Sequence, residues 1–216
     1  MKISTKLFAT GFVFFTVLLL EACDCQKTNT SQSSASDTLN LIKGSQYTVI
    51  DQSPMDISYC PDEFPENKLA GTSMQESPIA RVIYSRPHKK GRLIFGSNEK
   101  SLCKYGNSWR LGANEATEIS FFQPVNIDGK NVGAGRYTMY CIPFEDKWVI
   151  VLNSNIDSWG LQIDTSKDLM RFEVPVKKQS PAIEDFTIVF NAATYGSDML
   201  MAWDDVKILL PISYSK

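Results

Sequence analysis

Apolar and polar residues alternate along the chain from about Leu39 onward. In the segment LMRFEVPV (169–176), apolar side chains alternate with Arg171, Glu173 and Pro175, which is the period of a half-buried β-strand. Turn-forming residues such as Asp128-Gly129-Lys130 separate the apolar stretches. No window of about a dozen residues carries a helical apolar stripe, and one helical turn is expected at 166–169. The pattern predicts strands at 80–84, 118–122, 135–142, 148–152, 169–176, 186–190, 199–203 and 206–212.

Many short strands separated by turns are typical of an all-β fold. We expect one domain over residues 39–216, an antiparallel β-sandwich or jelly roll with Greek-key connections and little helix. Ala134-Gly135-Arg136-Tyr137 resembles the tyrosine corner of Greek-key sandwiches. The same residues also fit an ordinary glycine turn followed by a core tyrosine.

The N-terminus has the pattern of a bacterial export signal. Lys2 and Lys6 precede the apolar run Leu7–Leu20, which is shorter than the roughly 20 residues of a membrane-spanning helix. The run ends in Leu20-Glu21-Ala22-Cys23, which resembles a lipobox apart from the unusual Glu21. This predicts a signal peptide over 1–22 and a lipid on Cys23, which would anchor the chain to a membrane of the cell envelope, with the outer membrane preferred. Plain secretion and an uncleaved anchor are the alternatives.

The residues after Cys23 predict a tether. Gln26–Asp37 is rich in Ser, Thr, Gln and Asn and has no large apolar side chain. Such a segment cannot bury enough surface to order itself, so residues 23–38 are expected to link the membrane flexibly to the domain.

Four cysteines remain if Cys23 carries a lipid. Cys25, Cys60, Cys103 and Cys141 lack the spacing of a zinc site, and the chain has one histidine, so we expect neither a metal nor a cofactor. Cys60, Cys103 and Cys141 are expected to be unbridged core residues. An oxidising compartment leaves a Cys60–Cys103 or Cys103–Cys141 disulfide open.

Several sequence blocks carry a family resemblance. They are YSRPHKKGRLIFG (84–96), WRLGANEATE (109–118), AGRYT (134–138), DSWG (157–160) and AWDDVK (202–207). With them the chain resembles, from residue 53 to 207, an uncharacterised bacterial lipoprotein family, domain of unknown function 2911, common in Bacteroidota. The resemblance implies no reaction, because the family has no established activity.

Polar and aromatic residues concentrate between 84 and 118. Guanidinium groups bind carboxylate or phosphate in a bidentate manner, and aromatic faces stack on sugars or cations. In the alternative interpretation, Arg86 or Arg110 pairs with Glu115 or Glu118 inside the domain. We expect Arg86 to be structural and Arg110 to face a cleft. The candidate ligand-binding residues are Arg86, Arg92, Trp109, Arg110, Asn114 and Glu115.

No residue is predicted to be catalytic. His88, between two charged residues in an expected loop, lacks an orienting group and would be a poor general base. Glu115 and Glu118 could form the carboxylate pair of a glycoside hydrolase, although many surface pairs have that spacing. Asp204-Asp205 is interpreted as a turn before the final strand, since a hard cation would need further oxygen ligands.

The net charge of −2 argues against a nucleic-acid partner. The sequence therefore predicts a lipid-anchored envelope protein, a non-catalytic binding or interaction module for a glycan or anionic envelope ligand. Two alternatives are a hydrolase that acts on an envelope glycan through Glu115 or Glu118, and a structural subunit of an envelope complex.

Overall fold

The computed structural model describes residues 51–73 and 75–214. The predicted signal peptide, Cys23 with its lipid, Cys25 and the tether lie outside the described residues, as does the start of the predicted domain. Within the described part of the chain, no helix has the length and apolarity needed to cross a bilayer.

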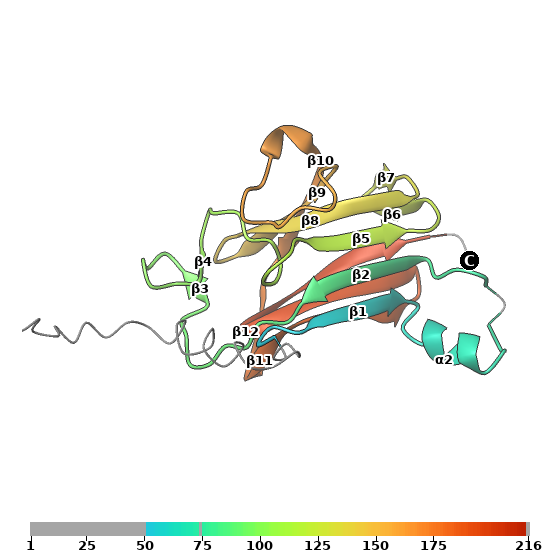
Figure 1. The fold of residues 1–216 in the computed structure, drawn as a ribbon, viewed down its shortest axis with the longest axis horizontal. Coiled ribbons are helices and arrows are strands. Elements are labelled where there is room, and N and C mark those ends of the chain that lie inside the picture. Colours follow the sequence, from blue (N-terminus) through green and yellow to red (C-terminus); the bar gives the residue numbers. More distant parts are fainter. Residues whose placement is uncertain (1–50, 74, 215–216) are drawn as a thin grey trace, which may run out of the picture. The chain divides into compact units, whose positions relative to one another are not determined.

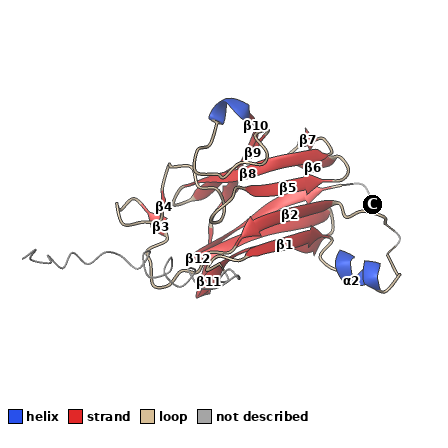
Figure 2. Cartoon of the chain, in the orientation of Figure 1, coloured by secondary structure: helices blue, strands red, loops and turns tan. Residues whose placement is uncertain are grey.

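Two antiparallel sheets form the domain (Figures 1 and 2). The six-stranded sheet contains, in spatial order, β1 (Met55–Cys60), β2 (Ala80–Ser85), β5 (Thr117–Phe121), β8 (Gly135–Pro143), β9 (Lys147–Asn153) and β10 (Asp168–Pro175). The four-stranded sheet contains β11 (Lys177–Ala193), β12 (Gly196–Ser213), β6 (Val125–Ile127) and β7 (Lys130–Val132). A short parallel pair, β3 (Phe95–Gly96) and β4 (Cys103–Lys104), stands apart. The prediction of an antiparallel all-β fold is confirmed.

Helix is limited to two short elements in the described residues. The turn expected near 166–169 is a 3₁₀ helix, η1 (Thr165–Lys167), whose first turn is capped by the Asp164 carboxylate, 3.1 Å from the Ser166 amide nitrogen. The helix α2 (Phe64–Leu69) was not predicted. It has no buried residue, so its sequence carries no apolar stripe that would mark it.

The connections differ from the predicted Greek key. The strands of the six-stranded sheet lie side by side in chain order, so that sheet is a meander, and the hairpin β6–β7 joins the other sheet between β5 and β8. β8 and β9 are joined by a short turn, whereas the connection from β2 to β5 is long and includes β3 and β4. The tyrosine-corner interaction does occur, because the Tyr137 hydroxyl donates to the carbonyl oxygen of Gly133 at 3.0 Å.

β12 spans both strands predicted at 199–203 and 206–212. A Cβ on Gly196 would lie 2.3 Å from the carbonyl oxygen of Ile212. A fully extended strand between these two residues would span about 50 Å, so the chain must fold back between them. Asp204, with φ of 56°, marks the turn that the sequence predicted at Asp204-Asp205.

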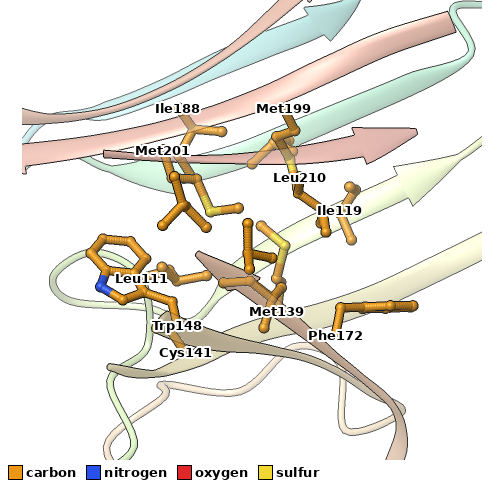
Figure 3. Close-up of a cluster of buried hydrophobic side chains, with 14 of the residues drawn as sticks. Leu111, Ile119, Met139, Cys141, Trp148, Phe172, Ile188, Met199, Met201 and Leu210 are labelled. Carbon is orange, nitrogen blue, oxygen red and sulfur yellow. The ribbon is translucent and has the colours of Figure 1, made fainter. Parts of the chain in front are cut away.

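The hydrophobic core lies between the two sheets. Figure 3 shows Ile119, Met139 and Phe172 of the six-stranded sheet facing Ile188 and Met199 of the other sheet, all of them buried. The prediction for the cysteines in the described residues is confirmed, since all three are buried and unbridged: Cys60, Cys103 and Cys141.

Candidate functional site

The connection from β9 to η1 crosses the face of the six-stranded sheet that is opposite the core. We call residues 154–164 the strap; in Figure 1 it leads into the orange segment before β10. The Thr138 hydroxyl donates to the carbonyl oxygen of Asn155 at 2.7 Å, and the Ala116 amide nitrogen donates to that of Ser158 at 3.1 Å. These bonds hold the strap against β8 and the start of β5.

Gly160 allows the strap to lie this close. It has a φ of +78°, and a Cβ at this position would lie 3.0 Å from Cα of Ala116 and 3.0 Å from Cδ of Arg110. The sequence blocks 109–118 and 157–160, which are well separated along the chain, are therefore packed directly on each other.

A cleft of about 530 Å³ lies beside the strap. Its floor includes Ile83, which is the cross-strand neighbour of Glu118. Trp159 of the strap is 57% exposed at this cleft. We call it the strap cleft, and its lining residues are Met55, Ile83, Glu115, Ala116, Glu118, Asp157, Ser158 and Trp159.

The carboxylates of the strap cleft differ in their partners. Glu118 accepts a hydrogen bond from the Asp157 amide nitrogen at 2.9 Å through Oε1, and its Oε2 lies 3.5 Å from Nε of Arg136. Arg136 also forms an ion pair with the Asp157 carboxylate. Glu115 is exposed and has no hydrogen bond or ion pair with any residue that the structure describes. The strap cleft therefore contains one unpaired carboxylate.

Arg86 is structural, as expected, but its partner is not one of the predicted glutamates. Its Nη1 lies 3.0 Å from Oδ2 of Asp56, its Nε donates to the carbonyl oxygen of Phe186 at 3.2 Å, and its Nη2 donates to the Thr187 hydroxyl at 3.1 Å. These contacts join β1, the end of β2 and β11. The prediction that Glu115 or Glu118 pairs with Arg86 or Arg110 is wrong, because Glu118 pairs with Arg136.

Arg110 is partly buried and has no hydrogen bond or ion pair from its guanidinium within 51–73 and 75–214. Burial lowers the pKa of this guanidinium. It lines a cavity of about 10 Å³ beneath the strap with polar neighbours that include Asn153 and Asn155. That cavity has room for about one water molecule, and Arg110 is not among the residues that line the strap cleft.

Three other predicted ligand residues have partners in the fold. Arg92 donates through Nε to the carbonyl oxygen of Lys89 at 3.0 Å and so closes its own loop. Trp109 is 9% exposed and packs in the core, with its ring centre 4.9 Å from that of Phe186. Asn114, with φ of 57°, donates to the Asp51 carboxylate at 3.1 Å. Of the six predicted ligand residues, all of them described, Glu115 alone lines the strap cleft.

Trp159 and Arg136 were not among the six predicted ligand-binding residues, although an open aromatic face at Trp159 was considered as a sign of glycan binding. The block DSWG was noticed as a motif, but nothing in the chain order places it beside Glu115. The usable signal was a tryptophan between Ser158 and Gly160 in a segment without strand alternation, where a core role is less expected.

The environment of His88 also differs from the prediction. Its Nδ1 contacts the Asp185 carboxylate, so an orienting group is present. Among the described residues, no serine or cysteine side chain forms a hydrogen bond with the His88 ring. The pair of His88 and Asp185 therefore lacks the nucleophile of a catalytic triad.

The described ranges hold no cluster of three or more His, Cys, Asp or Glu side chains that could bind a metal ion.

Comparison with known proteins identifies a family but no characterised relative. Neither the curated proteins nor the solved structures contain a match to the chain. A family model described as protein of unknown function (DUF2911) matches residues 65–212, which is more than half of the chain. The sequence blocks that contain Arg86, Arg110 and Glu115 lie inside this range, and so does the strap. The chain therefore belongs to the DUF2911 family of proteins of unknown function.

Proposed function

We propose that the domain is a non-catalytic carbohydrate-binding module that holds a glycan in the strap cleft. The observation that carries the proposal is the exposed side chain of Trp159 in a concave site with carboxylates. Aromatic faces pack against the C–H faces of sugar rings, while carboxylate oxygens accept hydrogen bonds from sugar hydroxyls. The cleft volume of about 530 Å³ lies within the range of ligand sites, roughly 300–1,000 Å³.

The partners of Glu118 favour binding over hydrolysis. Glycoside hydrolysis needs one carboxyl group as the acid and a second as base or nucleophile. Both oxygens of Glu118 are engaged, one by the Asp157 amide and the other by Arg136. Glu115 would therefore act without a free partner, which is why we place the hydrolase second.

The charge of the cleft lining argues against an anionic ligand. Three lining residues are acidic, namely Glu115, Glu118 and Asp157, and no lining residue is Lys or Arg. An acidic ligand would meet like charges at short range, so the glycan alternative is preferred over the anionic one.

Glycan binding can be tested with the full mature chain in detergent, first on a glycan array and then by calorimetry with the glycans retained. Trp159→Ala should weaken binding by about tenfold or more, as the loss of a central aromatic contact does. Phe122→Ala removes an aromatic side chain that is 43% exposed outside the cleft and serves as the matched control. An array without any bound glycan, or a Trp159→Ala protein that binds as tightly as wild type, would refute the proposal and favour the structural-subunit alternative.

We also propose that the module is tethered to the cell envelope through a lipid on Cys23. The support is the sequence pattern of residues 1–23. Cys23→Ser should abolish labelling by a fatty-acid probe and block signal-peptide processing, whereas Cys25→Ser should do neither. Label that persists on the Cys23→Ser protein would contradict the proposal.

A further inference from the structure

The unpaired carboxylate of Glu115 and the exposed indole of Trp159 line the same cleft. The other two carboxylates share the cation of Arg136, whereas Glu115 is without a partner among the described residues. A ligand with hydroxyl groups alone would satisfy hydrogen bonds in this cleft but would leave one negative charge unbalanced. A ligand that brings a positive charge would balance it.

We infer that the strap cleft selects glycans that carry a protonated amine, that is, amino sugars whose amino groups are not acylated. The inference rests on the proposed function and names the ligand class of the same site. Glu115 supplies a charge-assisted acceptor for the ammonium group, and Trp159 supplies an aromatic face that attracts cations. Glu115 is thus a specificity-determining residue.

The pairing of the remaining acidic residues explains why one amine suffices. Arg136 forms an ion pair with Asp157, and its Nε lies 3.5 Å from Oε2 of Glu118. The negative charges of these two carboxylates are therefore already partly neutralised. A sugar with an acetylated amine would present no charge to Glu115. A uronic acid would add a further negative charge beside three carboxylates.

Three oligosaccharides of equal length separate these cases: β-1,4-linked glucosamine, β-1,4-linked N-acetylglucosamine and β-1,4-linked glucose. They differ at one substituent on each ring, which is an ammonium, an acetamide or a hydroxyl group. Calorimetric titration of the full mature chain should show that the glucosamine oligomer binds about fivefold tighter than the other two. The difference should shrink between 50 mM and 500 mM salt, because added ions screen an exposed charge pair.

Glu115→Gln keeps the shape of the side chain and removes its charge, so the fold should be retained. It should lower the affinity for the glucosamine oligomer more than the affinity for the glucose oligomer, and so abolish the preference between them. Glu145→Gln removes an exposed carboxylate outside the strap cleft and should preserve the preference.

The outcomes separate this inference from the proposed function. Equal affinity for all three oligomers, or a preference that survives Glu115→Gln, overturns amine selection while glycan binding stands. Failure to bind any glycan overturns both. Loss of the preference in Glu115→Gln together with its retention in Glu145→Gln supports the inference.

Discussion

The guanidinium of Arg86, at the residue after β2, donates a hydrogen bond to the carboxylate of Asp56 in β1, with Nη1 and Oδ2 3.0 Å apart. The same guanidinium reaches β11 through Phe186 and Thr187. One side chain thus connects an edge of the six-stranded sheet with the opposite sheet. Arg110, from the neighbouring sequence block, has no comparable partner among the described residues. The two arginines should therefore respond differently to substitution.

Arg86→Ala should lower the free energy of unfolding by about 1–3 kcal/mol. Two hydrogen bonds to Phe186 and Thr187 contribute about 0.5–1.5 kcal/mol each, and the ion pair with Asp56 adds little because both side chains are about one-third or more exposed. Urea unfolding measures the loss. A double-mutant cycle with Asp56→Ala should give a coupling energy below about 1 kcal/mol. A larger coupling energy would mean that the ion pair, rather than the bonds to β11, is the main contribution.

Arg110→Ala should change the free energy of unfolding by less than about 1 kcal/mol. The substitution breaks no ion pair or side-chain hydrogen bond within the described residues. It also removes a partly buried guanidinium group, whose pKa is lowered by burial. Urea unfolding beside Arg86→Ala provides the comparison. A loss of about 3 kcal/mol or more would show that Arg110 supports the fold, as removal of a buried charge's partner does.

Gly160→Ala should displace the strap and reduce glycan binding. Its new Cβ would lie 3.0 Å from Ala116 and Arg110, and its φ of +78° is strained for alanine, so a loss of about 1–3 kcal/mol is expected. Hydrogen exchange of the Ala116 amide, which donates to Ser158, should become faster. Gly129→Ala is the matched control, because φ there is +73° and nothing lies within 4 Å of the added Cβ. If the Ala116 amide exchanges equally fast in both variants, the backbone strain that they share, and not the strap contact, is responsible.

The strands could be predicted because alternation is a local property of the sequence. In β5, the apolar residue Ile119 is buried and its polar neighbour Ser120 is half-buried. The alternation of residue types therefore indicates which face of the strand is covered. The sequence of helix α2 has no such pattern, since none of its residues is buried. The order of the strands was not predictable in the same way. Greek-key and meander sheets use strands of the same local pattern.

The site was predicted less well than the fold because its residues meet only after folding. Trp109 and Trp159 are the same residue type with neighbouring polar residues, yet one lies in the core and the other at the cleft. Likewise, the carboxylate next to Arg86 comes from Asp56, which precedes it by one strand and a helix, rather than from the nearer Glu115. Composition identified residue types that can bind a ligand, but only the position of the strap decides which of them line a cleft.

The buried thiols should make the domain less stable at alkaline pH. Burial raises the pKa of the Cys141 thiol well above its ordinary value of 9.0 and also raises the pKa of Cys60. The raised pKa means that the folded state retains protons which the unfolded chain releases. The contribution of these two protonated thiols to the free energy of unfolding is therefore complete below about pH 9 and is lost as the pH rises above that value.

Urea unfolding between pH 7 and pH 10 measures this dependence. The midpoint should fall above pH 9, and Cys141→Ala should reduce the slope of that fall. At pH 7 the midpoint should not change with reductant, because Cys60, Cys103 and Cys141 are unbridged. A midpoint that drops on reduction would indicate a disulfide that stabilises the domain by about 2–5 kcal/mol.

Fluorescence quenching should report on Trp159 alone among the four tryptophans of the chain. Trp109, Trp148 and Trp203 are 9%, 1% and 0% exposed, whereas Trp159 is 57% exposed, so acrylamide should reach mainly the last of these. Trp159→Phe should remove the quenchable fraction. Relative to the quenching of free tryptophan amide by the same ion, caesium should quench Trp159 better than iodide, because the carboxylates of Glu115 and Asp157 line the same cleft and attract the cation. Equal quenching by the two ions, each taken relative to free tryptophan amide, would show that the cleft does not concentrate cations at the indole, and it would remove the electrostatic basis for amine selection.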